Sequence, residues 1–263
     1  MTRKVSSILL AALLAMIVVT AACGSKQSTE TAPATPAATS AQAQPVDAAT
    51  AATITGTVKL DGAAPKGRRL RMDADPVCVA AHKEAVNDED VVVGQGNALA
   101  NVVVFVKSGL ENRAFNPPQE PVVLDQKGCQ YVPHVVAVMV NQKLEIRNND
   151  TTTHNIHPMP ANNREWNRSQ PPGSTPIEDS YAREEVAIPV KCNVHPWMKS
   201  YIAVIKNPYH AVTGTNGSFE LKNLPPGDYT IEAWHEKLGT SEQKITVGPK
   251  ETKAIEFLFK AQS

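Results

Sequence analysis

The sequence predicts an all-β protein, and three observations support this fold class. First, eight short runs are rich in β-branched residues or alternate apolar with polar residues, as strands do. They cover residues 53–60, 101–109, 135–148, 199–207, 217–224, 227–234, 241–247 and 252–259. Second, Gly, Pro, Asn or Asp bound most of these runs at regular spacing, which favours β-sandwiches. Third, only residues 75–86 look helical, with Asp75 as N-cap and Pro76 in the first turn.

The N-terminus resembles an export signal. Arg3 and Lys4 precede an apolar run at residues 8–19, and small residues lead to Cys23. A cysteine in this place resembles a bacterial lipoprotein signal, which implies cleavage after residue 22 and a lipid on Cys23. An ordinary secretory signal with a chance cysteine is the alternative. Gly24 after the cysteine, by the sorting rule of such lipoproteins, implies a periplasmic protein anchored in the outer membrane.

Residues 24–52 consist almost entirely of Ala, Thr, Ser, Gln and Pro. Such a segment cannot bury enough apolar surface to offset the entropy of ordering it, so we expect a disordered tether. About 210 residues remain for the folded part, enough for one large β domain or two small ones. Since 26 basic and 26 acidic side chains balance, the bulk charge gives no reason to expect a nucleic-acid partner.

Turn residues organise the C-terminal part, residues 212–247. Asn216-Gly217 predicts a tight hairpin and residues 225–227, Pro-Pro-Gly, predict another turn. Between them apolar residues alternate, Phe219 with Leu221 and then residues 229, 231 and 233. The pattern G-x-F-x-L-x-x-L-P-P-G-x-Y resembles the carboxypeptidase regulatory-like (transthyretin-like) domain. This resemblance implies a small β-sandwich and identifies a fold module, not an activity.

The first strand of that family has the form G-x-V followed by a D-G turn, and here it lies far upstream, at residues 56–62. We therefore expect a split sandwich, built from residues 53–115 and 207–263, with residues 116–206 inserted as a separate domain. The alternative is a tandem arrangement, in which residues 53–206 form one enlarged sandwich.

The expected insert contains a cluster of soft metal ligands. Cys192, His195 and Met198 fall within seven residues, and a thiol, an imidazole and a thioether suit copper better than calcium or magnesium. With residues 131–160, this segment resembles the cupredoxins, the small blue-copper proteins. Cys192-x-x-His195-x-x-Met198 is similar to the short ligand loop of the amicyanin type, and "HNIH" to the segment with the first histidine. The resemblance implies a Greek-key sandwich holding one type 1 copper ion by His154, Cys192, His195 and Met198.

Two asparagines match further positions of that family. In cupredoxins the asparagine after the first histidine bonds across to the residue that follows the cysteine, and Asn155 and Asn193 occupy these places. His157 remains an alternative to His154 as first ligand, and Met198 could be a core residue instead of a ligand.

The other histidines, His82, His134, His210 and His235, are expected to be structural or surface residues. Of the four cysteines, Cys23 is assigned to lipid and Cys192 to copper. Cys78 and Cys129 remain, and two leftover cysteines in an oxidising compartment usually pair. Two unpaired thiols are the alternative. Closing a loop of about fifty residues would contribute roughly 4 kcal/mol in the chain-entropy model.

Several metal and catalytic classes are excluded by missing residues. Methionine is not a usual zinc ligand, the loop lacks the second cysteine of a binuclear copper centre, and "HNIH" lacks the H-x-H spacing of multicopper oxidases. A c-type haem would need C-x-x-C-H. No catalytic triad or carboxylate pair stands out, so we do not expect an enzyme.

The sequence thus predicts a tethered copper protein that carries single electrons between redox partners, such as a cytochrome. A copper-delivery protein and a non-redox interaction module are the alternatives. In the cupredoxin arrangement the outer ring edge of His195 would reach solvent, with Pro196 and Trp197 beside it as an apolar rim, although Trp197 could equally be core. Because the net charge is zero, we expect docking to depend little on ionic strength.

Overall fold

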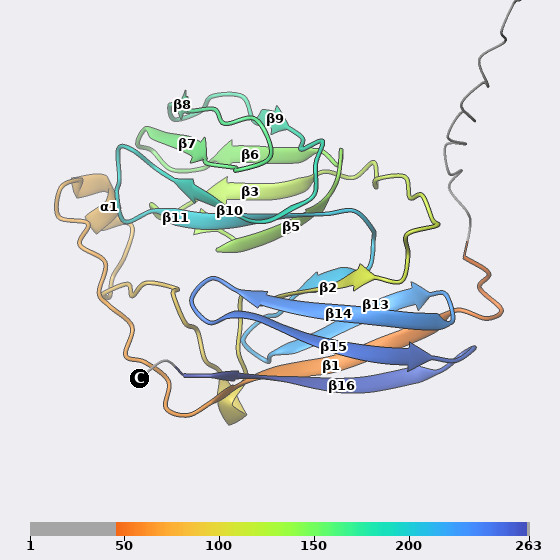
Figure 1. The fold of residues 1–263 in the computed structure, drawn as a ribbon. Helices are drawn as coiled ribbons and strands as arrows, with labels where there is room; N and C mark the ends of the chain where they lie inside the picture. The colour runs from red at the N-terminus through yellow and green to blue at the C-terminus, as the bar shows by residue number, and fades with distance from the viewer. Residues whose placement is uncertain (1–45, 262–263) are drawn as a thin grey trace, which may run out of the picture. The chain divides into compact units, whose positions relative to one another are not determined.

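The computed structural model describes residues 46–261, and the all-β prediction is confirmed. The predicted signal segment and the lipid site at Cys23 lie outside these residues. Among residues 46–261, no helix has the length and apolarity needed to cross a membrane. The strands form four sheets that pair face to face around two apolar cores (Figure 1). A third, smaller cluster of buried apolar residues, which includes Phe105 and Ile205, lies where strands of the two pairs of sheets meet.

Two sheets build the terminal sandwich from both ends of the described chain. One has the order β13 (Ser218–Leu224), β1 (Ala52–Asp61), β16 (Thr252–Lys260), and the other the order β12 (His210–Val212), β2 (Val103–Ser108), β14 (Gly227–His235), β15 (Gly239–Val247). β1 runs parallel to β16 and antiparallel to β13. Phe219, Leu221, Tyr229, Ile231 and Ala233 are all buried in its core, as their alternation predicts. Strands before residue 110 and after residue 209 therefore share one core.

The central sandwich contains every strand between residues 122 and 205. Its sheets have the orders β5 (Val135–Met139), β11 (Lys199–Ile205), β10 (Glu185–Lys191), β7 (His154–Pro158), β8 (Arg168–Gln170) and β4 (Tyr131–Val132), β3 (Val122–Gln126), β6 (Leu144–Asn148), β9 (Ile177–Asp179). Leu124, Ile146, Ile156, Ile188 and Ile202 are fully buried between them. These alternating aliphatic residues hold β7, β10 and β11 in place, and the candidate site lies at the ends of these strands.

A turn forms at Asn216-Gly217 as predicted, with Gly217 N–H donating to the Gly214 carbonyl at 2.9 Å and a positive φ of 65° at the glycine alone. The expected hairpin is wrong, because β12 and β13 on either side of the turn belong to different sheets. A Cβ on Gly217 would lie 2.5 Å from the carbonyl oxygen of Val58, so no larger residue fits against β1 there. The turn thus positions β13 beside β1.

Two boundaries differ from the sequence expectation. The tether was expected to extend to residue 52, yet Val46 packs against the terminal core and the Thr50 carbonyl accepts a hydrogen bond from Lys250 N–H at 3.1 Å. The predicted helix is short, since α1 spans only Pro76–Ala80, although the Asp75 side chain caps it through Val77 N–H as expected. A short 3-10 helix, η1, covers Gln95–Asn97.

Residues 68–86, which we call the strap, are a third departure. They were expected to belong with the terminal sandwich. Instead, Met72 and Cys78 are buried in the central core, and Leu70 and Val86 pack against it. The predicted Cys78–Cys129 disulfide is present and fastens α1 to the loop after β3. Apolar contacts and this covalent link thus hold the strap on the central sandwich.

His235, at the end of β14, makes stability depend on pH. Burial lowers its pKa to about 4, its Nδ1 accepts from Lys237 N–H, and its Nε2 has no hydrogen-bond partner among residues 46–261. A histidine whose pKa is lower in the folded than in the unfolded state, where it is near 6.5, stabilises the fold above pH 6.5. That contribution, about 3 kcal/mol, is lost as the pH falls from 6.5 to 4.

We therefore expect His235→Gln to flatten the pH dependence of the unfolding free energy between pH 7 and pH 4.5, measured by urea denaturation. The control is His82→Gln, a half-buried histidine of the strap that bonds to the Gly128 carbonyl. Equal slopes in wild type and His235→Gln would contradict the assignment.

Candidate metal centre

Three strands and one tight loop bring the candidate ligands together. His154 begins β7, Cys192 directly follows β10, and His195 lies in the loop that leads into β11. The loop closes on itself, because Met198 N–H donates to the His195 carbonyl at 2.9 Å and Cys192 N–H donates to the Met198 carbonyl at 3.2 Å. Strand β10 pairs with both β7 and β11, so the sheet itself sets the distance between His154 and the loop.

The side chains of His154, Cys192 and His195 converge. The two Nδ1 atoms of the histidines lie 2.8 Å apart, and Cys192 Sγ lies 3.9 Å from His195 Nδ1. Their ligand atoms all lie within 4.8 Å of one another. Each of the three residues is at most 3% exposed, and Met198 is 2% exposed in the same core. The structure thus brings together the donor atoms of three of the four predicted ligands, and Met198 is buried in the same core.

This donor set fits a metal ion. Metal–nitrogen bonds of about 2.0–2.1 Å and metal–sulfur bonds of about 2.3 Å would let one ion contact all three atoms at these separations. Two imidazole nitrogens that face each other in a buried site need a shared proton or a cation between them, because two lone pairs repel.

The sulfur of Cys192 lies among hydrogen-bond donors. The backbone N–H groups of Asn155 and His195 point to Sγ at 3.5 and 3.3 Å. Burial by itself would raise the pKa of Cys192, but bonds from His154 and from these N–H groups lower it overall. The site therefore favours the thiolate, which is the form that binds metals.

Asn155 also joins the two halves of the site. Its Oδ1 accepts from the N–H of Asn193 at 2.6 Å and of Val194 at 3.2 Å. This bond runs from the residue after His154 to the residue after Cys192, the pair that the sequence singled out. It holds the ligand loop against β7, so that the distance between thiol and imidazole does not depend on the ion alone.

Two carboxylates hold the far sides of the imidazoles, and sequence reasoning did not assign them to the site. His154 Nε2 lies 2.8 Å from Asp150 Oδ2, and His195 Nε2 lies 3.0 Å from Asp75 Oδ2. Carboxylates in this position orient the ring and leave the opposite nitrogen for a metal. Burial would lower the pKa of His154, yet Asp150 and Cys192 outweigh it and raise the pKa to about 9.

The Cys78–Cys129 disulfide connects these two carboxylates. Asp75 caps α1 three residues before Cys78 and also accepts from Thr152 Oγ1 at 2.9 Å. Asp150 accepts from the N–H groups of Gly128 and Cys129 at 2.6 and 2.7 Å. Both carboxylates are thus fixed next to one end of the disulfide. The only sequence signals were the N-cap pattern at Asp75 and the polar turn before His154.

The expectation that the ring edge of His195 reaches solvent is wrong. His195 is 3% exposed, because Asp75 and the strap cover its outer nitrogen. Trp197 is half-buried beside it, with ring centroids 4.9 Å apart, and its Nε1–H donates to the Cys129 carbonyl at 3.1 Å. The ligand loop is therefore roofed by a segment from more than 100 residues upstream.

The remaining histidines lie apart from the cluster. His157, the alternative first ligand, bonds through Nε2 to Glu165 and lies 3.4 Å from the Asn193 side chain through Nδ1. His134 bonds to Glu236, and His210 bonds through Nδ1 to the Asn207 carbonyl. Of the two histidines considered as first ligand, only His154 faces Cys192 and His195.

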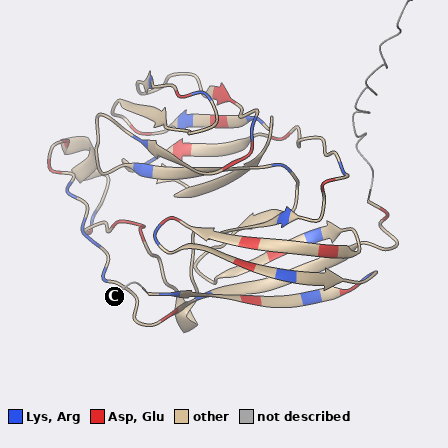
Figure 2. Cartoon of the chain, in the orientation of Figure 1, with Lys and Arg blue, Asp and Glu red and all other residues tan. Residues whose placement is uncertain are grey.

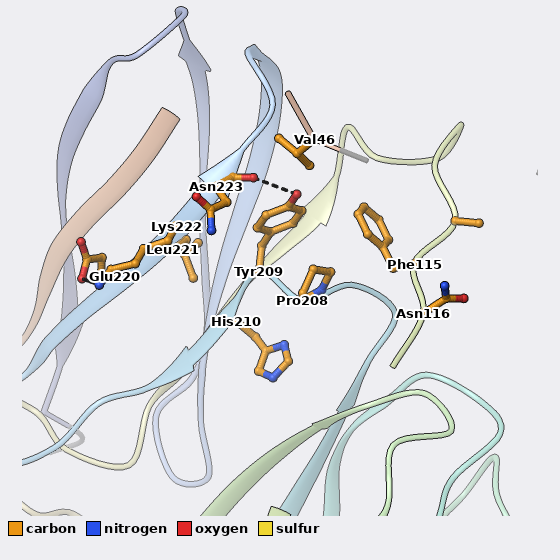
Figure 3. Close-up of a pocket in the computed structure, with 11 residues that line it drawn as sticks. Val46, Phe115, Asn116, Pro208, Tyr209, His210, Glu220, Leu221, Lys222 and Asn223 are labelled. Atoms are coloured by element: carbon orange, nitrogen blue, oxygen red, sulfur yellow. Dashed lines mark hydrogen bonds and ion pairs between the residues drawn. The ribbon is translucent and has the colours of Figure 1, made fainter. Parts of the chain in front are cut away.

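A pocket of 660 Å³ lies in the terminal sandwich, and none of the metal-cluster residues lines it. Figure 3 shows Tyr209 and Phe115 at its centre, with Val46 beside them and the Tyr209 hydroxyl bonded to the Asn223 carbonyl. The two rings pack edge to face with centroids 5.6 Å apart. Their contact stabilises the sandwich where the described chain begins.

Comparisons with known proteins give short structural matches. A Cu-containing nitrite reductase from Thermus scotoductus SA-01 matches 38% of this chain and 25% of its own, at 18% identity and a TM-score of 0.31. The oxidized P96G mutant of amicyanin matches 38% of this chain and 97% of its own, at 14% identity and 0.29. A purple cupredoxin from Nitrosopumilus maritimus matches 32% and 97%, at 20% identity and 0.27.

No family model matches the chain, and no curated protein matches it. The structural matches are too distant to carry an argument, so the case for the site stands on its own geometry. The resemblance of residues 212–247 to the carboxypeptidase regulatory-like domain stays a prediction.

Proposed function

We propose that this chain is a mononuclear copper protein that carries single electrons between redox partners. The observation that carries the proposal is the convergence of one thiol and two imidazoles at a buried point, with Met198 on the same loop. A thiolate with two imidazoles and a weak thioether ligand is the donor set of blue copper sites. Zinc would accept the first three ligands but not the methionine.

Bound copper would supply a one-electron change between Cu(I) and Cu(II). His154, Cys192 and His195 would hold it, with Met198 as a weaker fourth ligand. Asp75 and Asp150 keep both rings in one orientation, and Asn155 keeps the loop in place. Because these groups are already bonded to the protein, little rearrangement accompanies a change of charge. Each donor residue is at most 3% exposed, which supports a carrier and not an enzyme.

The compartment, the membrane anchor and the partner of the protein are part of the same proposal. The Cys78–Cys129 disulfide fits an oxidising compartment such as the periplasm. A lipid on Cys23, followed by a tether, would hold the two sandwiches at the outer membrane. The terminal sandwich would act as an accessory module of the carboxypeptidase regulatory-like type, with a cytochrome or another periplasmic carrier as partner.

Copper titration of the purified soluble protein, begun at Pro45 to omit the signal and tether, tests this proposal. We expect one Cu(II) per chain, an intense visible thiolate-to-copper band, and its reversible loss and return over repeated cycles of ascorbate and ferricyanide. A protein that takes up Cu(I) tightly but gives no such band with Cu(II) would be a copper-delivery protein. No copper uptake in either oxidation state would overturn the proposal entirely.

A further inference from the structure

A positively charged groove lies beside the metal-ligand loop, with a volume of 850 Å³. It is lined by Arg68, Arg69, Leu70, Arg71, Asp73, Pro196 and Trp197. Most of this lining comes from the start of the strap, and the last two residues come from the ligand loop. Figure 2 shows basic residues along the chain between β1 and α1, where this part of the strap lies.

The groove has an excess of positive charge. Three exposed arginines face one aspartate, which gives a formal excess of two (three minus one). Arg68 pairs with Asp88 at 3.2 Å, whereas Arg69 and Arg71 form no ion pair within residues 46–261. Because the whole chain has a net charge of zero, this excess is a local property that the balanced composition conceals.

The same groove reaches the metal cluster through one side chain. His195 cannot meet a partner directly, since Asp75 and the strap cover it. Trp197 contacts the His195 ring at 4.9 Å between centroids and also lines the groove. Its bond to the Cys129 carbonyl fixes the indole in that place. The indole of Trp197 therefore contacts the candidate ligand His195 on one side and forms part of the charged groove on the other.

We propose that this groove docks the acidic surface of a redox partner protein, with Trp197 and His195 as the route between the copper ion and the partner. The inference rests on the proposed function. One electron moves, so the ion is oxidised as the partner is reduced by one electron, or the reverse, and no bond or proton changes place. Electron-transfer contacts are small, and opposite charge raises the rate of encounter between the partners.

The central experiment measures electron exchange by stopped flow with a small acidic b-type cytochrome and a small basic c-type cytochrome. The test variant is Arg69→Glu/Arg71→Glu, which disturbs no ion pair of residues 46–261. The control is Lys244→Glu/Lys260→Glu, which makes the same charge change on β15 and β16 of the terminal sandwich. At low ionic strength, we expect the test variant to slow exchange with the acidic cytochrome about tenfold or more. Near 0.5 M salt the difference should nearly disappear.

Two further measurements test the groove and the route separately. In the copper-free protein, hexacyanochromate(III), a redox-inert paramagnetic anion, should broaden the backbone amide signals of residues 68–73, and the test variant should lose this broadening. Trp197→Leu should slow exchange with the acidic cytochrome severalfold while leaving the visible copper spectrum unchanged.

Several results would overturn the inference while the proposed function stands. One is that the test and control variants, both loaded with copper and redox-active, respond identically to salt. Another is faster exchange with the basic cytochrome in the wild type. A third is that the groove binds phosphatidylglycerol vesicles while exchange with the acidic cytochrome is insensitive to Arg69→Glu/Arg71→Glu, which would make it a membrane contact. Failure of the wild type to bind copper at all would instead overturn the proposed function.

Discussion

Cys192→Ser is expected to abolish the visible thiolate-to-copper band and to weaken Cu(II) binding by orders of magnitude. A serine hydroxyl stays protonated at neutral pH and is a poor copper ligand, whereas the surroundings of Cys192 favour the thiolate. No other thiol can replace it in residues 46–261, because Cys78 and Cys129 are joined. Absorption and copper titration measure the loss. Since the side chains have similar size, the unfolding free energy of the copper-free protein should change by about 1 kcal/mol or less.

A pair of histidine variants serves as the matched control. His154→Ala should remove the normal band, while His157→Ala should keep it, because His157 points to Glu165 and not to the cluster. The two residues lie on the same strand three positions apart, so a general effect of truncating β7 would affect both. If the band survives in Cys192→Ser, or if His157→Ala and not His154→Ala removes it, the ligand assignment is wrong.

The strands and the ligand cluster could be predicted from the sequence because the patterns that indicate them are local. Alternation at Phe219 and Leu221 marks a strand with one buried face, and the spacing of Cys192 and His195 places both on one loop. His154 is 38 residues away from Cys192 in sequence, and it was found from its resemblance to a known segment and not from spacing alone. The disulfide followed from counting cysteines.

The residues that surround the ligands could not be predicted from the sequence in the same way. Asp75 contacts His195 although the two are 120 residues apart in sequence. The sequence of the strap does not predict this contact, because an N-cap aspartate has the same pattern in any helix. The family pattern describes the ligand loop and says nothing of a segment added over it, so His195 was expected to be exposed. The balanced net charge likewise concealed Arg69 and Arg71, which form no ion pair in the part of the chain that the structure describes. Local patterns thus identify the ligands, and long-range contacts decide which surface a partner meets.

Replacing both bridged cysteines, in Cys78→Ala/Cys129→Ala, should have the second large effect. The bridge closes a loop with a sequence separation of 51 residues, so its loss is expected to lower the unfolding free energy by about 4 kcal/mol in the chain-entropy model. It should also release the strap locally, since the bridge joins α1 to the loop that holds Asp150. We expect faster hydrogen exchange at residues 68–86 and faster removal of copper by a chelator.

Val79→Ala is the control, because this residue belongs to α1 but is 50% exposed and lies outside the core. It should leave both exchange and chelation unchanged. The comparison distinguishes whether the disulfide or the apolar contacts keep the strap on the central sandwich. If the apolar contacts of Leu70 and Met72 with the central core were sufficient, the double variant would lose global stability yet keep slow exchange at residues 68–86. That outcome would contradict the role we give the disulfide at the site. Fast exchange in the strap with normal protection in β7 and β10 would show that the bridge keeps Asp75 on His195 and the ligand loop covered.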